Sequence, residues 1–287
     1  MDDDEDLADG DPGLFGPGSV TWRLHADPLM GLAGLRALLL QALHPGAMAA
    51  FESGSRYRDD LWGRLSRTAE YVAVTTYGSC AEAMTAAARV RAVHATVAGV
   101  SPEGRPYRAD DPELLRWVHC CLVDSFLSVP VRGGVSCTQE EQDRYVAEQV
   151  ASAVLVGLDP EDVPTTVAQV RATLREFRPR LRAGGAARSA ALFLIVPPMP
   201  NTLLHATAAR PAWASLAGLA FAALPSWARG MYALPEPPPS ALLKDAAVTV
   251  ALHTLRTTLR GVSAAVPALR EPPQLRSARL RLVPPPS

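Results

Sequence analysis

The stretch that decides how this chain folds is RLSRTAEYVAVTTYGSCAEAMTAAARVRAVHATVAG, residues 64–99. Its apolar residues recur every three or four positions, which predicts two helices. Ser79 and Glu82 form an S-x-x-E capping box, so we expect the second helix to begin there. Polar and charged side chains interrupt the apolar pattern, namely Arg64, Arg67, Thr68, Arg91 and His94. Because a buried charge is costly unless it is paired or bound, this stretch predicts a binding site.

Helical periodicity continues through most of the chain. Asp111 precedes a proline and Thr138 opens a second capping box, and both patterns are typical of helix starts. His44-Pro45-Gly46 predicts a break or kink, because proline cannot continue the hydrogen-bond ladder. Expected helices cover residues 27–43, 47–53, 60–78, 79–99, 111–126, 138–157, 166–183, 211–224 and 241–266. Residues 190–196 are predicted as a short strand or a buried helical piece.

These patterns predict a mainly α protein with a single helical domain over residues 20–266. No alternating strand series and no β-hairpin signal is present in the sequence. Residues 1–19 are acidic and rich in Gly and Pro, which predicts a disordered tail. Residues 267–287 are rich in Pro and Arg, which predicts an extended tail.

Composition limits the classes of function. The chain has 287 residues with 28 Lys plus Arg and 29 Asp plus Glu, a net charge of -1, so nothing favours a nucleic-acid partner. The N-terminus is acidic where a signal peptide is basic, and no long uninterrupted apolar run occurs. We therefore expect a cytoplasmic protein without a transmembrane segment and with its four cysteines reduced. The oligomeric state stays open.

Taken by position alone, His94 allows two interpretations, and so does the pair formed by Arg64 and Thr68. His94 is either an iron or metal ligand or an ordinary hydrogen-bonded histidine, and it is expected to share a helix face with Arg91. Arg64 and Thr68 share a face and can clamp a carboxylate and donate to a bound oxygen species, or form a solvated face with a salt bridge to Asp60 or Glu70. The remaining two positions are His119, expected as a buried core histidine, and Asp124, expected to pair with Arg91 or Arg64.

Motifs of other enzyme classes are missing from the sequence. It contains no H-E-x-x-H, G-x-S-x-G or G-x-G-x-x-G pattern and no P-loop. Hydrolase and nucleotide-binding functions therefore have no support.

A series of short segments, in order, resembles the oxygenase MpaB and latex-clearing (rubber oxygenase) family of b-type haem proteins. Each segment is weak alone, and their order and spacing carry the resemblance, which covers roughly residues 25–235. The segments are Leu39-Leu40-Gln41-Ala42-Leu43-His44-Pro45, Arg64-Leu65-Ser66-Arg67-Thr68, Val90-Arg91-Ala92-Val93-His94, Gly104-Arg105-Pro106-Tyr107, Asp111 to His119, Asp124-Ser125-Phe126-Leu127 and Asp143-Arg144-Tyr145-x-x-Glu148.

The resemblance implies an all-α, globin-like core that binds haem b, with His94 as the proximal iron ligand. It implies a distal, catalytic group of Arg64, Arg67 and Thr68, and a cofactor-binding set of Arg64, Arg91, His94 and His119. The implied reaction uses dioxygen and an apolar small molecule, with cleavage of a carbon–carbon double bond as the family precedent. Two alternatives remain, a haem sensor or carrier without turnover and a haem-free helical interaction protein.

The chain departs from the rubber-cleaving members at one notable position. Those members have a lysine where this chain has Arg67, and an arginine stays protonated and does not usefully bind iron. The resemblance therefore does not imply a resting bond between this side chain and iron. Export signals typical of members that act on secreted polymer are also missing, so polyisoprene is a poor substrate expectation.

Overall fold

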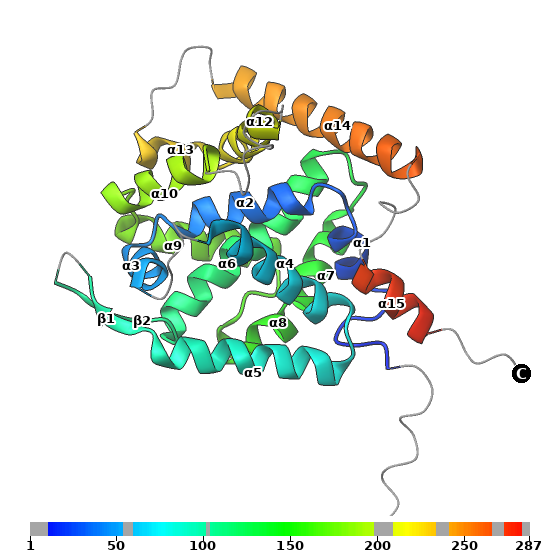
Figure 1. The fold of residues 1–287 in the computed structure, drawn as a ribbon, viewed down its shortest axis with the longest axis horizontal. Coiled ribbons are helices and arrows are strands. Elements are labelled where there is room, and N and C mark those ends of the chain that lie inside the picture. The colour runs from blue at the N-terminus through cyan, green and yellow to red at the C-terminus, as the bar shows by residue number, and fades with distance from the viewer. Residues whose placement is uncertain are drawn as a thin grey trace, which may run out of the picture.

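The computed structural model describes residues 11–53, 60–101, 104–197, 209–233, 241–265 and 273–282. The fold is mainly α, as predicted, and Figure 1 shows the helices stacked around a central pair, α2 and α6. The α-helices are α1 (Val20–His25), α2 (Met30–Gln41), α3 (Pro45–Ser53), α4 (Leu61–Tyr77), α5 (Cys80–Thr96), α6 (Pro112–Arg132), α7 (Gln139–Glu148), α8 (Val150–Leu155), α9 (Val167–Phe177), α10 (Gly185–Ile195), α12 (Ala209–Ala222), α13 (Ser226–Tyr232), α14 (Ala241–Ala265) and α15 (Pro273–Arg281). Two 3₁₀ turns, Pro160–Asp162 and Arg178–Arg180, flank α9.

Helix α6 is the centre of the core. Asp111 caps it by accepting hydrogen bonds from the backbone N–H groups of Glu113 and Leu114 at 2.9 and 3.2 Å, as the sequence predicted. Helices α2 and α9 both pack on it, and α12 packs on α2. Because α6 is surrounded by other helices, it buries residues on more than one face, including Trp117, Cys121 and Val129.

Helix α6 is also the one described helix that is long and apolar enough to cross a membrane, whereas we expected no transmembrane segment from the sequence. Its apolar window has a mean hydropathy of 1.4 and is 67% buried inside the protein. A core helix passes the same test, so this helix is weak evidence for a membrane span.

A buried ion pair joins α2 to α6. The Arg36 guanidinium donates to Asp124 Oδ2 at 2.7 Å and to the backbone oxygen of Ala223 at 3.0 Å. Asp124 therefore pairs with Arg36, and the prediction that it pairs with Arg91 or Arg64 is wrong. The sequence missed this partner because it lies 88 positions away along the chain.

Helices α4 and α5 form an antiparallel pair whose start sites follow the sequence signals. Asp60 Oδ1 accepts a hydrogen bond from the Gly63 N–H at 3.0 Å and caps α4. Ser79 and Glu82 form both hydrogen bonds of the predicted capping box, at 3.1 and 2.8 Å, and start α5. The two helices pack together, and α5 runs along the lower edge of the molecule in Figure 1.

Helix α5 ends earlier than predicted, because a small hairpin follows it. Strands β1 (Ala98–Val100) and β2 (Pro106–Arg108) pair antiparallel, with Gly99 opposite Tyr107. Gly99 therefore lies in a strand and does not end the helix. Three-residue strands are too short to show an alternating pattern, so this hairpin was not predicted from the sequence.

The described terminal segments are more ordered than the predicted tails. Near the N-terminus, Asp11 Oδ2 accepts a hydrogen bond from the Cys80 N–H at 2.8 Å, and the segment before α1 is a series of turns. Near the C-terminus, α15 lies against α4. The Arg281 guanidinium donates to the backbone oxygens of Asp11 at 3.0 Å and Tyr77 at 2.9 Å, so both segments meet at the α4–α5 junction.

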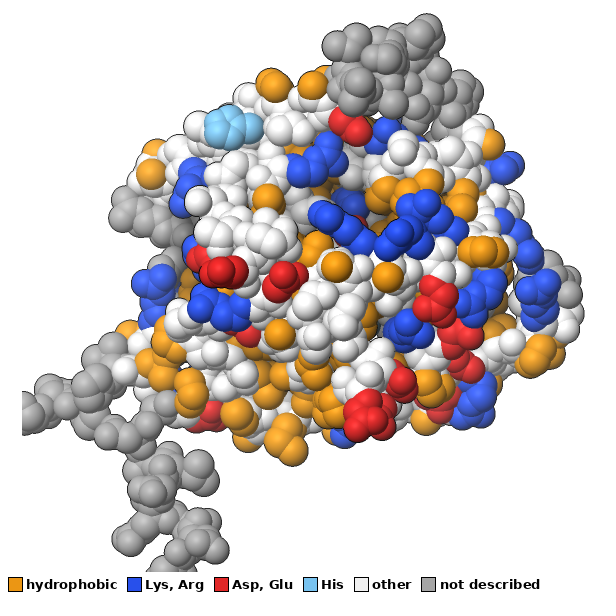
Figure 2. Space-filling view, turned by 180° about the vertical axis from the view of Figure 1, so that it is seen from behind, with side chains coloured by type: hydrophobic (Ala, Val, Ile, Leu, Met, Phe, Trp, Pro, Cys, Tyr) orange, Lys and Arg blue, Asp and Glu red, His pale blue; other side chains and the backbone are white. Residues whose placement is uncertain are grey.

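Two further boundaries differ from the predictions. Residues 190–195 belong to helix α10, so the alternative of a short strand is wrong there. The predicted helix over 138–157 is divided into α7 and α8 at Gln149. Tertiary packing decides the structure of residues 190–195, because a short apolar run fits either a strand or a buried helix. On the face shown in Figure 2, acidic and basic side chains occur together, in keeping with the net charge of -1.

Candidate active site

A pocket lies between α2, α3, α4, α5, α6 and α10, with a volume of about 290 Å³. This volume is close to the lower end of small-molecule sites, about 300–1,000 Å³. Its described lining includes four polar side chains: Gln41, Arg64, Thr68 and His94. The rest of the lining is apolar, supplied by Leu, Ala, Val, Phe and Met side chains. The pocket therefore suits a largely apolar ligand with few polar contacts.

His94 reaches this pocket from the last turn of α5. Its ring is half-buried, and Nδ1 is buried without a hydrogen-bond partner among the described residues. Burial lowers the pKa of the imidazole, and the Asp110 carboxylate opposes this shift without cancelling it. The histidine is therefore neutral at neutral pH, which is the form that binds a metal.

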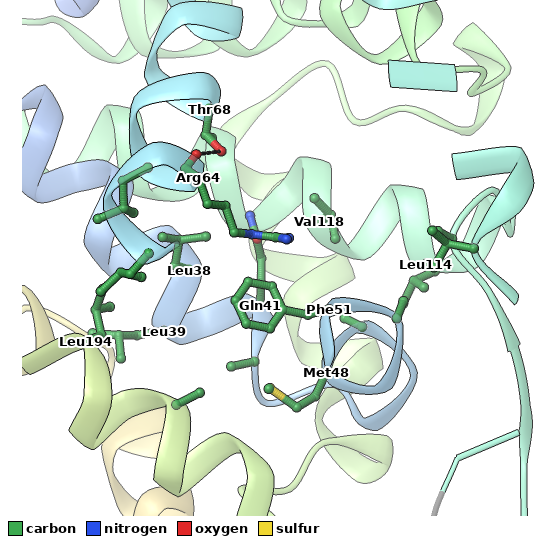
Figure 3. A pocket seen from close by; sticks show the side chains of 18 of the residues that line it. Leu38, Leu39, Gln41, Met48, Phe51, Arg64, Thr68, Leu114, Val118 and Leu194 are labelled. Atoms are coloured by element: carbon green, nitrogen blue, oxygen red, sulfur yellow. Dashed lines mark hydrogen bonds between the residues drawn. The ribbon is translucent and has the colours of Figure 1, made fainter. Parts of the chain in front are cut away.

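Arg64 reaches the same pocket from α4. Its guanidinium carbon lies 4.0 Å from the ring centroid of Phe51 on α3, and Figure 3 shows the side chain extended into the pocket toward this ring. Burial, and to a smaller degree the neighbouring Arg67, lowers the pKa of Arg64. Among the described residues, no carboxylate pairs with it. Arg64 is therefore a cation in a mostly apolar cavity, free to bind an anion.

Thr68 lines the pocket one turn after Arg64. Its hydroxyl donates a hydrogen bond to the backbone oxygen of Arg64 at 3.0 Å (Figure 3). The hydrogen is thus used within the helix, and the predicted donation from Thr68 to a bound oxygen species is not supported by this arrangement. The hydroxyl oxygen keeps its capacity to accept.

Three predicted site residues do not line the pocket. Arg67 lies at the surface, 66% exposed, where its guanidinium pairs with Asp60 at 3.0 Å. Arg91, three positions before His94 on α5, does not line the pocket, and its guanidinium donates to the backbone oxygen of Leu155 on α8. His119 is buried in α6, as a core histidine, and burial lowers its pKa to about 4. The predicted catalytic role of Arg67 and the predicted cofactor-binding roles of Arg91 and His119 find no support in their placement.

The sequence did not single out Gln41 and Phe51, which the structure places in the pocket. Gln41 is a polar residue that ends the apolar run Ala37 to Leu40 of α2, close to the His44-Pro45 break, and that contrast was the available signal. Phe51 gave no signal, because one aromatic residue in a short apolar helix is typical of a core position. His44 lies nearby, and its Nδ1 accepts a hydrogen bond from the Ala47 N–H at 3.3 Å at the start of α3.

The donor set of this pocket differs from that of a metal site built by protein ligands alone. Among the described residues, no three His, Cys, Asp or Glu side chains come together. A structural or catalytic zinc site needs three or four such ligands, whereas a haem iron needs one axial side chain. A single neutral histidine on the wall of an apolar cavity fits the second kind of centre.

The comparison with known families agrees with this geometry. Residues 22–260 match the model of the ER-bound oxygenase mpaB/B'/rubber oxygenase catalytic domain. The chain belongs to this family. The matched range holds all of the pocket-lining residues. No curated protein and no solved structure matches this chain. The match confirms the resemblance and the oxygenase class, and it leaves the cofactor and the substrate to inference.

Proposed function

We propose that this chain is a haem b-dependent oxygenase in which His94 binds the iron. The observation that supports it best is the meeting of two residues from different helices in one cavity. His94 of α5 and Arg64 of α4 both line the pocket, which is otherwise almost entirely apolar. Membership of the mpaB/rubber oxygenase family supports the oxygenase part of the proposal.

The chemistry of the pocket residues fits a haem group. The imidazole is neutral, and its Nδ1 has no protein partner in the described part of the chain. The apolar lining suits the macrocycle, and a guanidinium is a suitable partner for a carboxylate of the cofactor or of a substrate. Of the predicted cofactor-binding set, His94 and Arg64 are the two whose placement supports a direct role.

Haem b, when bound, would supply the chemistry that activates dioxygen, because cofactors carry such redox chemistry in enzymes. The protein's own side chains would bind and orient the organic substrate. Leu38, Leu39 and Leu194 form one apolar wall and would exclude water from the reacting double bond (Figure 3). Arg64 would stabilise negative charge that develops in the cavity, because a preorganised cation is effective in apolar surroundings. The proposed reaction is oxidative cleavage of a carbon–carbon double bond in an apolar molecule.

An absorption spectrum of the protein produced with a haem precursor tests the proposal. The purified protein should show a Soret band that shifts when carbon monoxide is added after reduction. His94→Ala should lose this band. His253→Ala is the matched control, because His253 is exposed on α14 outside the pocket lining, and it should keep the band.

Other outcomes of these measurements would contradict the ligand assignment or favour one of the alternative functions. A Soret band that persists in His94→Ala would overturn the ligand assignment. A normal spectrum without oxygen uptake on a panel of lipids and terpenoids would favour a haem sensor or carrier. A colourless, folded protein that refuses added haemin would favour a haem-free interaction protein.

A further inference from the structure

We propose that helices α10 and α12 carry a surface that binds anionic phospholipid membranes. The docking surface consists of Arg188 and Leu192 of α10, Val196 directly after it, and Arg210 and Trp213 of α12. The two helices pack against each other in the upper left part of Figure 1. None of the five residues belongs to the pocket lining, so the docking surface is separate from the proposed cofactor site.

The stretch of sequence that supplies both helices is basic. Residues 177–235 contain six arginines and no Asp or Glu. All 29 acidic residues of the chain therefore lie outside this stretch, although the whole chain has a net charge of -1. Since anionic phospholipids attract clusters of basic residues, this uneven distribution of charge favours a negatively charged surface as the partner.

The cations of the docking surface are available to a partner. Arg188 and Arg210 are both exposed. Among the described residues, neither pairs with a carboxylate, whereas Arg180 of the same stretch pairs with Glu113 at 2.6 Å. Because the protein does not neutralise these two guanidinium groups, they can bind the phosphates and carboxylates of lipid head groups.

Helix α10 exposes aliphatic side chains on the face that carries Arg188. Leu192 is 55% exposed and Val196 is 46% exposed. The three residues follow one another at a spacing of four, and the Val196 N–H donates to the Leu192 backbone oxygen at 2.9 Å, so they form one row along the helix. Such side chains can enter the acyl boundary of a bilayer while the guanidinium stays among the head groups.

Trp213 continues this surface on α12. Its indole is half-buried, and Nε1 donates to the backbone oxygen of Leu194 at 2.8 Å, which holds the ring beside α10. Arg210 lies one turn earlier on the same helix. Tryptophan is enriched at the interface between membrane and water, where its amphipathic ring sits at the level of the head groups.

An acidic protein is the other partner that this charge would attract. Protein interfaces carry polar groups around an apolar centre and are matched in shape to one partner. A bilayer requires only cations and protruding apolar groups on the same face, and the docking surface has both. We therefore infer a membrane as the partner.

The position of α10 gives membrane binding a consequence for the proposed function. The inner side of this helix lines the pocket through Ala190, Phe193 and Leu194. A membrane at its outer side would lie next to the pocket wall, close to apolar molecules dissolved in the bilayer. That consequence rests on the proposed function, whereas membrane binding itself does not.

Sedimentation of the full-length protein, as purified, with large lipid vesicles tests the proposal. One set of vesicles contains phosphatidylcholine alone, and the other also contains phosphatidylserine. The wild-type protein should bind the anionic vesicles at least about tenfold more tightly, and added salt should weaken this binding. The measurement needs no haem, so its outcome is independent of the spectrum that tests the proposed function.

Two double variants separate the charged and the apolar contributions. Arg188→Gln/Arg210→Gln should reduce the affinity for anionic vesicles at least about tenfold, because each arginine near such a surface contributes roughly fivefold. Leu192→Ser/Val196→Ser should weaken binding to both kinds of vesicle, since these side chains would no longer bury apolar area in the bilayer.

Matched controls remove the same kinds of group from α14 and α15. Arg260→Gln/Arg276→Gln changes the net charge by the same amount, and Val250→Ser/Val262→Ser removes two exposed valines. Both controls should bind vesicles as the wild type does. Circular dichroism melts of all variants would show that each is folded.

Several outcomes would overturn the proposal. Two of them are a wild-type protein that does not bind anionic vesicles and equal losses in the controls and the surface variants. Self-association that is lost in Leu192→Ser/Val196→Ser, without vesicle binding by the wild type, would assign the surface to a second copy of the chain. Binding to polyglutamate without binding to vesicles would assign it to an acidic protein.

Discussion

Arg64 and Arg67 lie three positions apart on α4, but they face different surroundings. Arg64 lies over Phe51 inside the pocket, whereas Arg67 is 66% exposed and pairs with Asp60 at 3.0 Å. Arg67, the position at which the resemblance implies a lysine in rubber-cleaving members, does not line the pocket of this chain.

The first prediction concerns position 67. Because Arg67 does not line the pocket, Arg67→Lys should leave the absorption spectrum of the haem-loaded protein and its response to carbon monoxide unchanged. Arg64→Lys, in contrast, should alter ligand binding. A new iron coordination state in Arg67→Lys would contradict the placement of this side chain at the surface.

The second prediction concerns the buried pair of α2 and α6. Asp124→Ala leaves the Arg36 guanidinium, whose side chain is 4% exposed, without its carboxylate. Breaking a buried pair in this way should lower the free energy of unfolding by about 3–5 kcal/mol. Urea unfolding measures this change.

A pair whose arginine is exposed provides the control for Asp124→Ala. Arg144 pairs with Glu148 at 3.7 Å, and the Arg144 side chain is 58% exposed. Arg144→Ala should therefore cost no more than about 1 kcal/mol. Similar costs for the two variants would show that the Arg36–Asp124 pair contributes no more than a surface pair.

The third prediction is a pH dependence of stability. Burial lowers the pKa of His25 to about 3 and that of His119 to about 4, whereas an unfolded histidine titrates near about 6.5. The unfolded chain therefore binds more protons between these values, and the folded state loses stability as the pH falls below about 6.5. At pH 5 each histidine should cost about 2 kcal/mol relative to pH 7.

His119→Gln isolates this contribution, because the remaining titrating groups are unchanged. Urea unfolding at pH 7 and pH 5 should give a smaller loss of stability for the variant than for the wild type. Parallel pH profiles of the two proteins would contradict the assignment of His119 as a neutral buried group.

The fourth prediction concerns the meeting of the two ends of the described chain. Arg281 of α15 donates to the backbone oxygens of Asp11 and Tyr77. Arg281→Ala should release the segment before α1, with faster amide hydrogen exchange over residues 11–19. Arg276→Ala, an exposed position on the same helix, should leave the exchange unchanged. Equal exchange in both variants would mean that Arg281 does not hold this segment.

The sequence predicted the features that depend on neighbours along the chain. The capping boxes at Ser79 and Thr138 and the Asp111 cap are confirmed, because each involves groups within three or four positions. The hairpin over 98–108 escaped prediction because its strands are too short for a pattern. The sequence left the secondary structure of residues 190–196 open between a strand and a helix, because an apolar run of seven residues suits either.

The candidate site was predicted only in part, because its residues come from several helices that lie far apart in the sequence. His94, Arg64 and Thr68 were named from the sequence and line one pocket. Arg91 lies three positions before His94, but its long side chain reaches a backbone oxygen of α8, at Leu155, and does not line the pocket. Phe51 and Gln41 join the pocket from other helices, so spacing could not reveal them.

The sequence by itself determined the mainly α fold, the capped helix starts at Asp60, Ser79, Asp111 and Thr138, the family and the residue types that can carry chemistry, because these follow from local hydrogen bonding and from order along the chain. The tertiary structure alone decided which of the charged residues share a cavity. Arg36 became part of the core because Asp124 lies opposite it, and Arg67 stayed at the surface beside Asp60. Arg64 became the free cation of the pocket because packing placed it over an aromatic ring and brought no described carboxylate within reach.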